Sequence, residues 1–502
     1  MAELLNRING IIWGLPALVL IIGVGIYLTV KTRFVQVRLF PRALVMFCKQ
    51  FTGKGTSRDG VSPYQALCTA LAATVGTGNI VGVAGALAIG GPGAIFWMWC
   101  CGFLGMAIKF AEATLAVRYR KQNSAGEWVG GPMYMIRQGM DKRWHWLAGV
   151  YAFFGVVAAF GVGNATQINA VIGGVNSALT ALGGKPSFAG NLLMGIFLAV
   201  IIALILLGGA RRIGKIAERL VPLTSVLYLL MCIGILVVCY RQIPAALWRI
   251  IDGAFSPEAV TGGAIGSALV ALRVGASRGV FTNEAGMGTA AIAHASADVN
   301  NPVEQGMMGI VEVFLDTLVM CSLTALAILC SGVMIPFGRD IGSALTTDAF
   351  VSVYGDWISV VLALCLCFFA LATVLGWGLY GVRCAQYLFG ANVWKKFVYI
   401  QCVTVLIGAV LQTQTVWQIS EIVNGLMVIP CLIALAHLTP ELVMLTKNFR
   451  KKNSTLGADG GTYENINQCK PMRAFTYAEI SSVGFGSGEA GKEDLSSEYR
   501  TA

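Results

Sequence analysis

Residues 72–83 read AATVGTGNIVGV, and residues 274–288 read VGASRGVFTNEAGMG. Each stretch lies near the middle of a long apolar run, over 63–89 in the first case and 262–297 in the second. Glycine and polar residues are costly there unless the backbone lines a cavity. Both stretches therefore predict interrupted helices, whose unwound backbone offers carbonyls to a cation and amides to a carboxylate. The alternative is close helix packing through small residues, above all around Gly82.

The composition of the 502-residue chain explains why such runs belong in a membrane. Apolar residues make up 56%, charged residues 12%, and the mean hydropathy is +0.71. A soluble chain carries about a quarter charged residues, so this chain cannot cover itself with a water-facing surface. Its net charge of +11 sits mostly in short loops, which argues against a nucleic-acid partner. Most of the 14 cysteines lie inside apolar runs without metal-ligand spacing and are interpreted as small apolar fillers.

Apolar runs of about 20 residues are long enough to cross a bilayer. The sequence therefore predicts an all-α polytopic membrane protein with about eleven transmembrane helices. These are expected at 10–30, 63–89, 92–118, 147–173, 188–208, 214–240, 262–297, 303–335, 356–389, 396–412 and 416–446. The membrane domain would thus occupy 1–446, with no cleavable signal peptide, and residues 447–502 would form a disordered cytoplasmic tail.

The basic residues of the loops predict an orientation. With the N-terminus outside, the inside segments hold 24 Lys or Arg and the outside segments hold five. The inside segments are 31–60, 118–146, 208–219, 297–303, 383–396 and 447–452. This asymmetry follows the positive-inside rule, so the C-terminus is expected in the cytoplasm. For a bacterial chain, the membrane would be the inner (plasma) membrane.

The order of the runs predicts an internal repeat. Leaving out the extra helix at 10–30, residues 63–240 and 262–446 each hold five predicted spans, and each group begins with an interrupted span. An odd number of spans per unit makes the second copy inverted. Interrupted helices at matching places in two inverted halves indicate a transport site near the middle of the membrane.

Ionisable side chains inside predicted spans are functional candidates. Lys109 and Glu112 lie three residues apart and could pair on one helix face. Glu312 and Asp316 lie four apart, a spacing that would place a cation or a proton between them. Simple ion pairing is the alternative explanation. Gating or coupling roles are assigned to Glu112, Arg278, Glu284 and Asp316.

Four motifs carry a resemblance to a known family. They are TGNIVGVA at 77–84, GGPGAIFWMW at 90–99, GGPMY at 130–134 and FTNEAGMGT at 281–289. Together they resemble the alanine or glycine:cation symporter family, over about residues 10–445. The resemblance implies a five-plus-five inverted repeat of the amino-acid and neurotransmitter:sodium symporter type with one extra N-terminal helix. It also implies sodium-coupled import of small neutral amino acids, chiefly alanine and glycine. No cofactor is expected beyond sodium as the coupling ion.

The same resemblance implies a substrate site. The amides of Thr77 and Gly78 would face the substrate carboxylate, and the Asn79 side chain would reach the substrate or an ion. Gln167 would hold the charged ends of the substrate. The residues expected to bind substrate are Thr77, Gly78, Asn79, Gln167, Phe281, Thr282 and Trp377, of which Phe281 and Trp377 would wall the side-chain pocket. A packing role for Trp377 is the alternative.

A sodium site is implied beside it. The carbonyls of Ala72 and Val75 and the hydroxyl of Thr373 would supply the hard oxygen ligands that an alkali cation prefers. These three residues come from the first interrupted span and from the ninth span.

Other functions remain open from the sequence. Glutamine could replace alanine as the substrate, since relatives with this motif set carry it. A proton could replace sodium, with Glu112 or Asp316 as the titrating group. An amino-acid-sensing receptor or a channel would need features that the short tail at 447–502 does not offer. An enzyme is excluded because the sequence has no nucleophile–base constellation, phosphate loop or metal cluster. The oligomeric state is left unassigned.

Overall fold

The structure is a computed structural model that describes residues 7–8, 10, 12–13, 15–51, 61–124, 126–263, 265, 267–339, 342–410 and 413–458. The chain divides into a compact unit, Met1–Asp459, and a second unit, Gly460–Ala502, that lies outside the described residues. The first unit is helical, and in the described part its only sheet is the antiparallel pair β1 (Lys121–Gln122) and β2 (Trp128–Val129). The predicted all-α class is therefore confirmed.

Eight helical segments of the described chain are long and apolar enough to cross a membrane. They are built from α7 (Gly93–Arg118), α9 (Trp146–Phe160) with η3 (Gly161–Ala165) and α10 (Thr166–Ala181), α11 (Phe188–Leu206), α12 (Gly209–Val238), α17 (Pro302–Val313) with η5 (Phe314–Cys321) and α18 (Ser322–Cys330), α20 (Ile358–Phe389), α21 (Trp394–Val410) and α22 (Thr413–Ala458). A ninth is the bent pair formed by α5 (Pro63–Thr74) with η1 (Thr77–Asn79) and α6 (Val81–Gly90). The chain is thus a multi-pass membrane protein.

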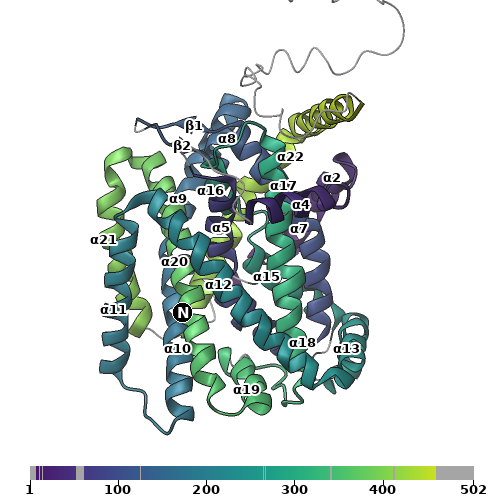
Figure 1. The fold of residues 1–502 in the computed structure, drawn as a ribbon, viewed down its shortest axis with the longest axis vertical. Helices are drawn as coiled ribbons and strands as arrows, with labels where there is room; N and C mark the ends of the chain where they lie inside the picture. The colour runs from purple at the N-terminus through teal and green to yellow at the C-terminus, as the bar shows by residue number, and fades with distance from the viewer. Residues whose placement is uncertain are drawn as a thin grey trace, which may run out of the picture. The chain divides into compact units, whose positions relative to one another are not determined.

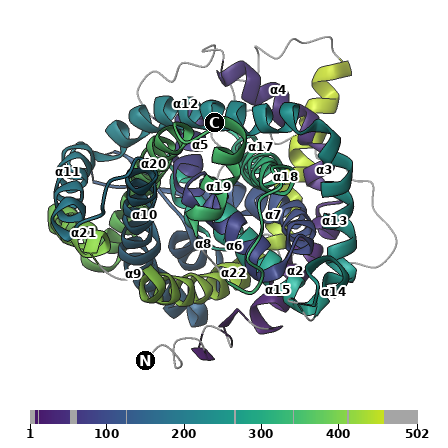
Figure 2. The same ribbon diagram turned by 90° about the horizontal axis from the view of Figure 1, so that it is seen from below.

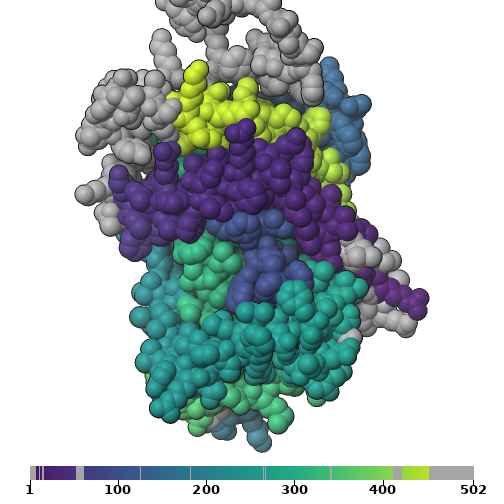
Figure 3. Space-filling view, turned by 90° about the vertical axis from the view of Figure 1, so that its right-hand side faces the viewer, coloured from purple at the N-terminus to yellow at the C-terminus, as the bar shows by residue number. Residues whose placement is uncertain are grey.

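The remaining elements are shorter. They are α2 (Leu15–Lys31), α3 (Val35–Arg38), α4 (Phe40–Phe51), α8 (Pro132–Gly139), η2 (Lys142–Trp144), η4 (Tyr240–Gln242), α13 (Ile243–Phe255), α14 (Pro257–Thr261), α15 (Ala268–Asn283), α16 (Thr289–Ala295), α19 (Ser343–Tyr354) and η6 (Ala391–Val393). Figure 3 shows the N-terminal helices as a purple band that crosses one face of this unit.

Each of the eleven predicted spans coincides with one of these helices or with a broken pair of them. The total of eleven crossings is nevertheless not confirmed, because α2 has 17 residues and α15 has 16. The last helix, α22, continues past the predicted boundary at 446 to Ala458. The rest of the predicted tail lies outside the described residues.

Loops that the basic residues assigned to one side do meet at one end of the unit. The Arg383 guanidinium lies 2.9 Å from a Glu127 carboxylate oxygen, and Arg118 lies 2.6 Å from Glu441. Arg120 donates hydrogen bonds to backbone carbonyls of the 295–299 segment. In Figure 1, β1, β2 and α8 lie at this end, and α13 and α19 lie at the other.

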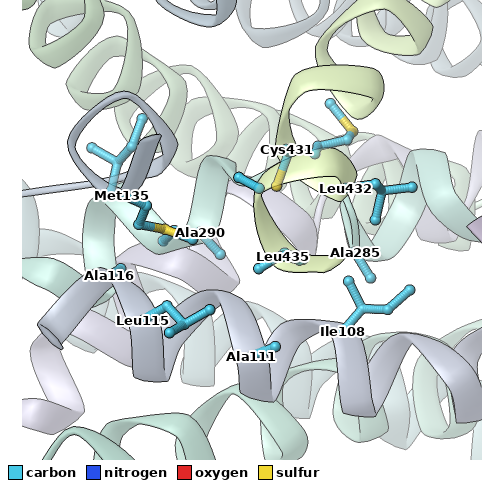
Figure 4. Packing of buried hydrophobic residues seen from close by; sticks show 14 of the residues in the cluster. Ile108, Ala111, Leu115, Ala116, Met135, Ala285, Ala290, Cys431, Leu432 and Leu435 are labelled. Carbon is cyan, nitrogen blue, oxygen red and sulfur yellow. The ribbon is translucent and has the colours of Figure 1, made fainter. Parts of the chain in front are cut away.

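The buried centre of the unit contains the two half-helices α5 and α6. Their side chains are almost all buried, and Figure 2 shows both helices inside a surround that includes α9, α11, α12, α13, α21 and α22. Small and flexible side chains let α7, α8, α16 and α22 approach closely nearby. Figure 4 shows this packing through Ile108, Ala111, Leu115, Ala116, Met135, Ala285, Ala290, Cys431, Leu432 and Leu435. The core thus holds α7 and α22 against the start of α16.

Candidate functional site

The first interrupted helix is present where the sequence predicts it. Helix α5 ends at Thr74, and α6 leaves the break at an angle of 54°. The amide of Gly76 donates to Asn79 Oδ1 at 3.0 Å. Because that amide would otherwise close the next turn of α5, the Ala72 carbonyl loses its helical partner. The break therefore presents a backbone acceptor in a fully buried place.

The second break is real but lies further along the chain than predicted. Helix α15 runs unbroken to Asn283, and the chain unwinds over 284–288, where Gly286 and Gly288 adopt φ of 93° and 74°. At Gly275 the packing alternative holds instead, because a Cβ there would lie 2.3 Å from the Ala94 carbonyl oxygen. Within the stretch 274–288, where the sequence predicts an interruption, the break is thus confined to 284–288.

Glu284 holds this second break in shape. Its φ of 54° is left-handed, a conformation that costs a non-glycine residue about 1–2 kcal/mol. Its buried carboxylate accepts hydrogen bonds from Trp377 Nε1 at 2.7 Å and from Thr289 Oγ1 at 2.5 Å. These two bonds offset the backbone strain and tie α20 to the start of α16.

At Gly78 the first break lies against the last turn of α15, directly before the second break. A Cβ on Gly78 would lie 3.0 Å from Thr282 Cγ2 and 3.7 Å from Phe281 Cδ1. The structure thus brings three of the predicted substrate residues together. The Thr282 hydroxyl donates to the carbonyls of Gly279 and Arg278, so this hydroxyl is satisfied within its own helix.

Thr77 and Gln167, both predicted to bind substrate, are also in contact. Thr77 Oγ1 donates to Gln167 Oε1 at 2.7 Å, and Gln167 Nε2 donates to the Val162 carbonyl at 3.1 Å. Val162 lies in η3, a π-helical turn that widens the helix next to the first break. Helix α10 therefore supplies an amide side chain that reaches the break.

Thr373 lies directly against the first break, as its predicted sodium role requires. Its hydroxyl oxygen is 2.4 Å from the position of a Cβ on Gly76, so only glycine fits there. The hydroxyl donates to the Phe369 carbonyl at 3.0 Å, which leaves its lone pairs available as acceptors. Ala72 and Val75, the other predicted sodium ligands, are 0% and 2% exposed in the adjoining turn.

Trp377 is placed differently from the expected pocket wall. Its ring packs on Gly163, where a Cβ would lie 2.2 Å from Trp377 Cβ, and its indole N–H bonds Glu284. Trp377 therefore has the packing contacts of the alternative prediction, and it also bonds the second break through Glu284.

Asn79 joins the first break to η5. Its Nδ2 donates to Asp316 Oδ1 at 2.7 Å and to the Asp316 carbonyl at 3.1 Å. Thr317 Oγ1 donates to Asp316 Oδ2 at 2.8 Å and accepts from Asn283 Nδ2 at 3.0 Å. A buried polar chain thus runs from the first break to the end of α15. The sequence named Asn79 and Asp316 separately and missed Asn283 and Thr317.

Glu112 bonds the second break rather than Lys109. Its Oε1 accepts the amides of Gly286 and Gly288 at 2.8 and 2.9 Å. Lys109 lies 3.2 Å from Glu312 on the neighbouring α17. The predicted Lys109–Glu112 pair is therefore not formed, because unwound amides satisfy Glu112 first.

Glu312 and Asp316 have different polar partners, so the predicted cation or proton between them stays a prediction. Glu312 lies 2.9 Å from His294 Nε2 and also contacts Lys109. The π-helical segment η5 begins at Phe314, between the two acids, and changes their helical phase. The sequence could not show this change of pitch.

Arg278 reaches the last helix. Its guanidinium lies 3.0 Å from Glu421 on α22, and the two side chains are 19% and 15% exposed. Sequence reasoning assigned a gating role to Arg278 without its partner. Glu421 is an acid inside the predicted span 416–446, the signal that could have revealed it.

Two interrupted helices that meet inside a polytopic helical protein are typical of secondary transporters. Comparison with known proteins gives the family. The sodium:alanine symporter family matches residues 1–460, and the chain belongs to it. It is accordingly a transporter and not an enzyme.

Two relatives and one solved structure illustrate the match. The sodium/alanine symporter AgcS of Methanococcus maripaludis is 40% identical, over 91% of this chain and 99% of that protein. The probable sodium/glutamine symporter GlnT of Bacillus subtilis is 35% identical, over 93% and 95%. The crystal structure of MhsT in complex with L-phenylalanine aligns with a TM-score of 0.56 at 16% identity, over 76% of this chain and 90% of that one, which is a likeness of fold.

Proposed function

We propose that this protein imports small neutral amino acids, chiefly alanine or glycine, together with sodium, by alternating access. The observation that carries the proposal is the contact of the first break, at Gly78, with the last turn of α15 that leads into the second break. Gln167 bonds Thr77 of the first break, and Thr373 lies against its Gly76. On the distribution of its basic loops we place the N-terminus outside and the C-terminus in the cytoplasm. For a bacterial chain, the membrane would be the inner (plasma) membrane. The five-plus-five inverted repeat belongs to the same proposal.

The substrate would lie between the breaks. Unwound amides at Thr77 and Gly78 offer hydrogen bonds to a carboxylate, and the Gln167 side chain lies within reach of the same turn. Phe281 Cδ1 lies 3.7 Å from the position of a Cβ on Gly78, so its ring would wall the side-chain pocket. The preference for alanine and glycine rests on the family and on the relative named as a sodium/alanine symporter.

Sodium would lie next to the first break. Ala72 and Val75 would offer their carbonyl oxygens from the buried end of α5, and the Thr373 hydroxyl of α20 lies against the adjacent Gly76. A cation there would stabilise the unwound backbone in the shape that binds the substrate. Each ligand would then raise the affinity of the other by the same factor.

The sodium gradient would supply the work of transport. One elementary charge that crosses 100 mV releases about 2.3 kcal/mol. The Arg278–Glu421 pair between α15 and α22 would close one side of the site, and the Asn79–Asp316 contact would couple the two breaks. Rocking of one group of helices against the other would then expose the site to each side in turn.

Uptake of labelled alanine into proteoliposomes tests the proposal, with sodium or choline outside at matched pH. We expect uptake that requires sodium and that unlabelled glycine inhibits. Glutamine is the second candidate substrate, since the relative GlnT is named for it, and competition by glutamine alone would replace alanine by glutamine. Uptake that persists in choline and collapses with an uncoupler would overturn sodium coupling in favour of protons.

A further inference from the structure

An apolar cavity of about 240 Å³ lies between α4, α5, α12 and η5, beside the site described above, with which it shares only Val75. Figure 2 shows α4, α5 and α12 side by side. The walls of the cavity run from Val75, 2% exposed beside the first break, to Val226 and Phe51, which are 52% and 56% exposed. The cavity therefore reaches from the lateral surface of the bundle toward the first break.

The lining of the cavity selects an apolar occupant. Aromatic rings form one wall, where Phe47, Phe51 and Tyr64 have centroids 6.1 to 6.3 Å apart. Leu71, Leu229 and Met320 add aliphatic surface. Ser225 also lines the cavity, and its hydroxyl is buried without a hydrogen-bond partner among the described residues. A space lined in this way excludes water and takes an apolar ligand.

Helix α12 joins this cavity to positive charge. Lys215, Arg219, Pro222, Val226 and Leu229 follow one another at intervals of three and four residues, so they share one face of the helix. The last three line the cavity, whereas Lys215 and Arg219 are exposed. Arg219 lies three residues before Pro222, which is about 4.5 Å along the helix axis. On this face of α12, two basic side chains therefore lie N-terminal to the three residues that line the apolar cavity.

Helix α4, which forms one wall of the cavity, has the features of a helix that lies at the membrane surface. It has 12 residues, too few to span a bilayer, and it is amphipathic. Phe47 and Phe51 line the cavity, while Arg42 and Lys49 are exposed. Basic residues of such a helix attract anionic lipid headgroups. Both helices thus place positive charge around the same apolar opening.

We propose that this cavity binds one acyl chain of an anionic phospholipid, with the headgroup held by Lys215 and Arg219. The acyl chain lies between α5 and α12 and touches Val75 at its inner end. The buried Ser225 hydroxyl donates a hydrogen bond to an ester oxygen of the lipid. The site is separate from the amino-acid site and does not depend on which substrate is carried.

Photolabelling of the full chain tests the site directly. The protein is placed in phosphatidylcholine vesicles that contain phosphatidylglycerol with a photoactivatable group in its acyl chain, and the labelled peptides are mapped by mass spectrometry. We expect label in 64–75 and 221–229. Unlabelled phosphatidylglycerol should remove it at several-fold lower content than added phosphatidylcholine. Equal competition by the two lipids would overturn the anionic headgroup, and label spread evenly over the lipid-facing helices would overturn the site.

Two tryptophan variants make the test specific. Val226→Trp fills the mouth of the cavity, and Leu230→Trp adds the same bulk on an exposed position of α12 outside it, where Leu230 is 61% exposed. We expect label in 64–75 to fall several-fold in the first variant and to stay in the second. Equal labelling of the two variants would refute the proposal. Replacing Lys215 and Arg219 by Gln should remove the preference for phosphatidylglycerol, while Arg241→Gln should leave it unchanged.

Discussion

Gly76 lies so close to Thr373 that substitutions at these two positions can distinguish a packing role of Thr373 from a role in sodium binding. Gly76→Ala places a Cβ 2.4 Å from the Thr373 hydroxyl oxygen, so we expect a clear fall in thermal stability and loss of sodium-dependent uptake. The double variant Gly76→Ala/Thr373→Ala removes the clashing oxygen. It should regain stability, measured as the unfolding temperature in detergent.

The same double variant should not regain sodium dependence, because the proposed ligand is the missing hydroxyl. Thr373→Ser keeps that hydroxyl and serves as the control, with a half-saturating sodium concentration near that of the wild type. If the double variant takes up alanine with normal sodium affinity, then Thr373 does not bind the ion.

Lys109 and Glu312 form a fully buried ion pair at 3.2 Å. Lys109→Met leaves the carboxylate with His294 alone, and breaking such a pair costs about 3–5 kcal/mol of unfolding free energy. Lys109→Met/Glu312→Gln removes both charges and should lower the free energy of unfolding by less than either single substitution does. If the losses of the two single variants simply add up in the double variant, then the ion pair contributes nothing to stability.

At the level of single residues, the sequence predicted which side chains lie at the breaks better than it predicted what they contact. Thr77, Gly78, Gln167, Phe281 and Thr373 do gather at the breaks. The contact partners of these side chains were predicted less well, because a three-residue spacing on a helix allows a contact without requiring it. Lys109 finds Glu312 across a helix interface, and Glu112 finds free amides 174 and 176 residues away in sequence. Contacts of that separation depend on helix packing, which one sequence does not reveal.

The second break depends on one carboxylate from α7. Glu112 Oε1 accepts two amides, from Gly286 and Gly288. Glu112→Gln keeps a carbonyl oxygen at that place, whereas Glu112→Ala leaves both amides buried without a partner at a cost of about 1–3 kcal/mol each. We therefore expect faster hydrogen exchange over 284–290 and loss of uptake in the Ala variant, with a much smaller change in the Gln variant. Equal exchange in both variants would contradict this role.

An ion pair, from Glu127 to Arg383, attaches the hairpin between α7 and α8 to α20. This ion pair is called the clamp below. Partial burial acts to raise the pKa of Glu127, but the hydrogen bond from Arg383 and its charge outweigh it, so the pKa lies below the ordinary value. A depressed pKa stabilises the folded state above the unfolded pKa, and that stabilisation is lost as the pH falls through the folded pKa. Glu127→Gln should therefore lower stability at neutral pH, by no more than about 1 kcal/mol for a half-exposed pair.

The pH dependence of that effect provides the check. The difference between wild type and Glu127→Gln should begin to shrink in unfolding measurements as the pH falls below the ordinary glutamate pKa of about 4.3. It should vanish only below the lowered pKa of Glu127 in the folded protein, where the carboxylate is protonated. In an Arg383→Gln background, Glu127→Gln should change little at any pH. A difference that persists unchanged into acid would mean that the clamp is not ionic.

At the level of elements, the hydropathy pattern predicted where helices lie, and each predicted span has its helix or broken pair. The exact site of the second break was less predictable. Gly275 and the glycines at 286 and 288 look alike in sequence, yet the first packs against Ala94 and the others adopt left-handed φ. The sequence did not predict the π-helical segments η3 and η5 either. Within η5, Asp316 receives a hydrogen bond from Asn79, 237 residues away in sequence.

The molecule as a whole brings its two interrupted helices into one polar unit. Gly78 touches the α15 side of the second break, Asn79 bonds Asp316, and Asn283 completes the chain through Thr317. A ligand that fixes the first break therefore acts on contacts that also hold the second. Sodium and amino acid should consequently bind as a coupled pair.

Equilibrium binding of labelled alanine to the purified protein tests that coupling most directly. We expect sodium to raise the alanine affinity and alanine to raise the sodium affinity by the same factor, as linkage requires. Thr373→Ala should reduce the coupling, whereas Thr373→Ser should keep it. Alanine binding of equal affinity in sodium and in choline would contradict the account.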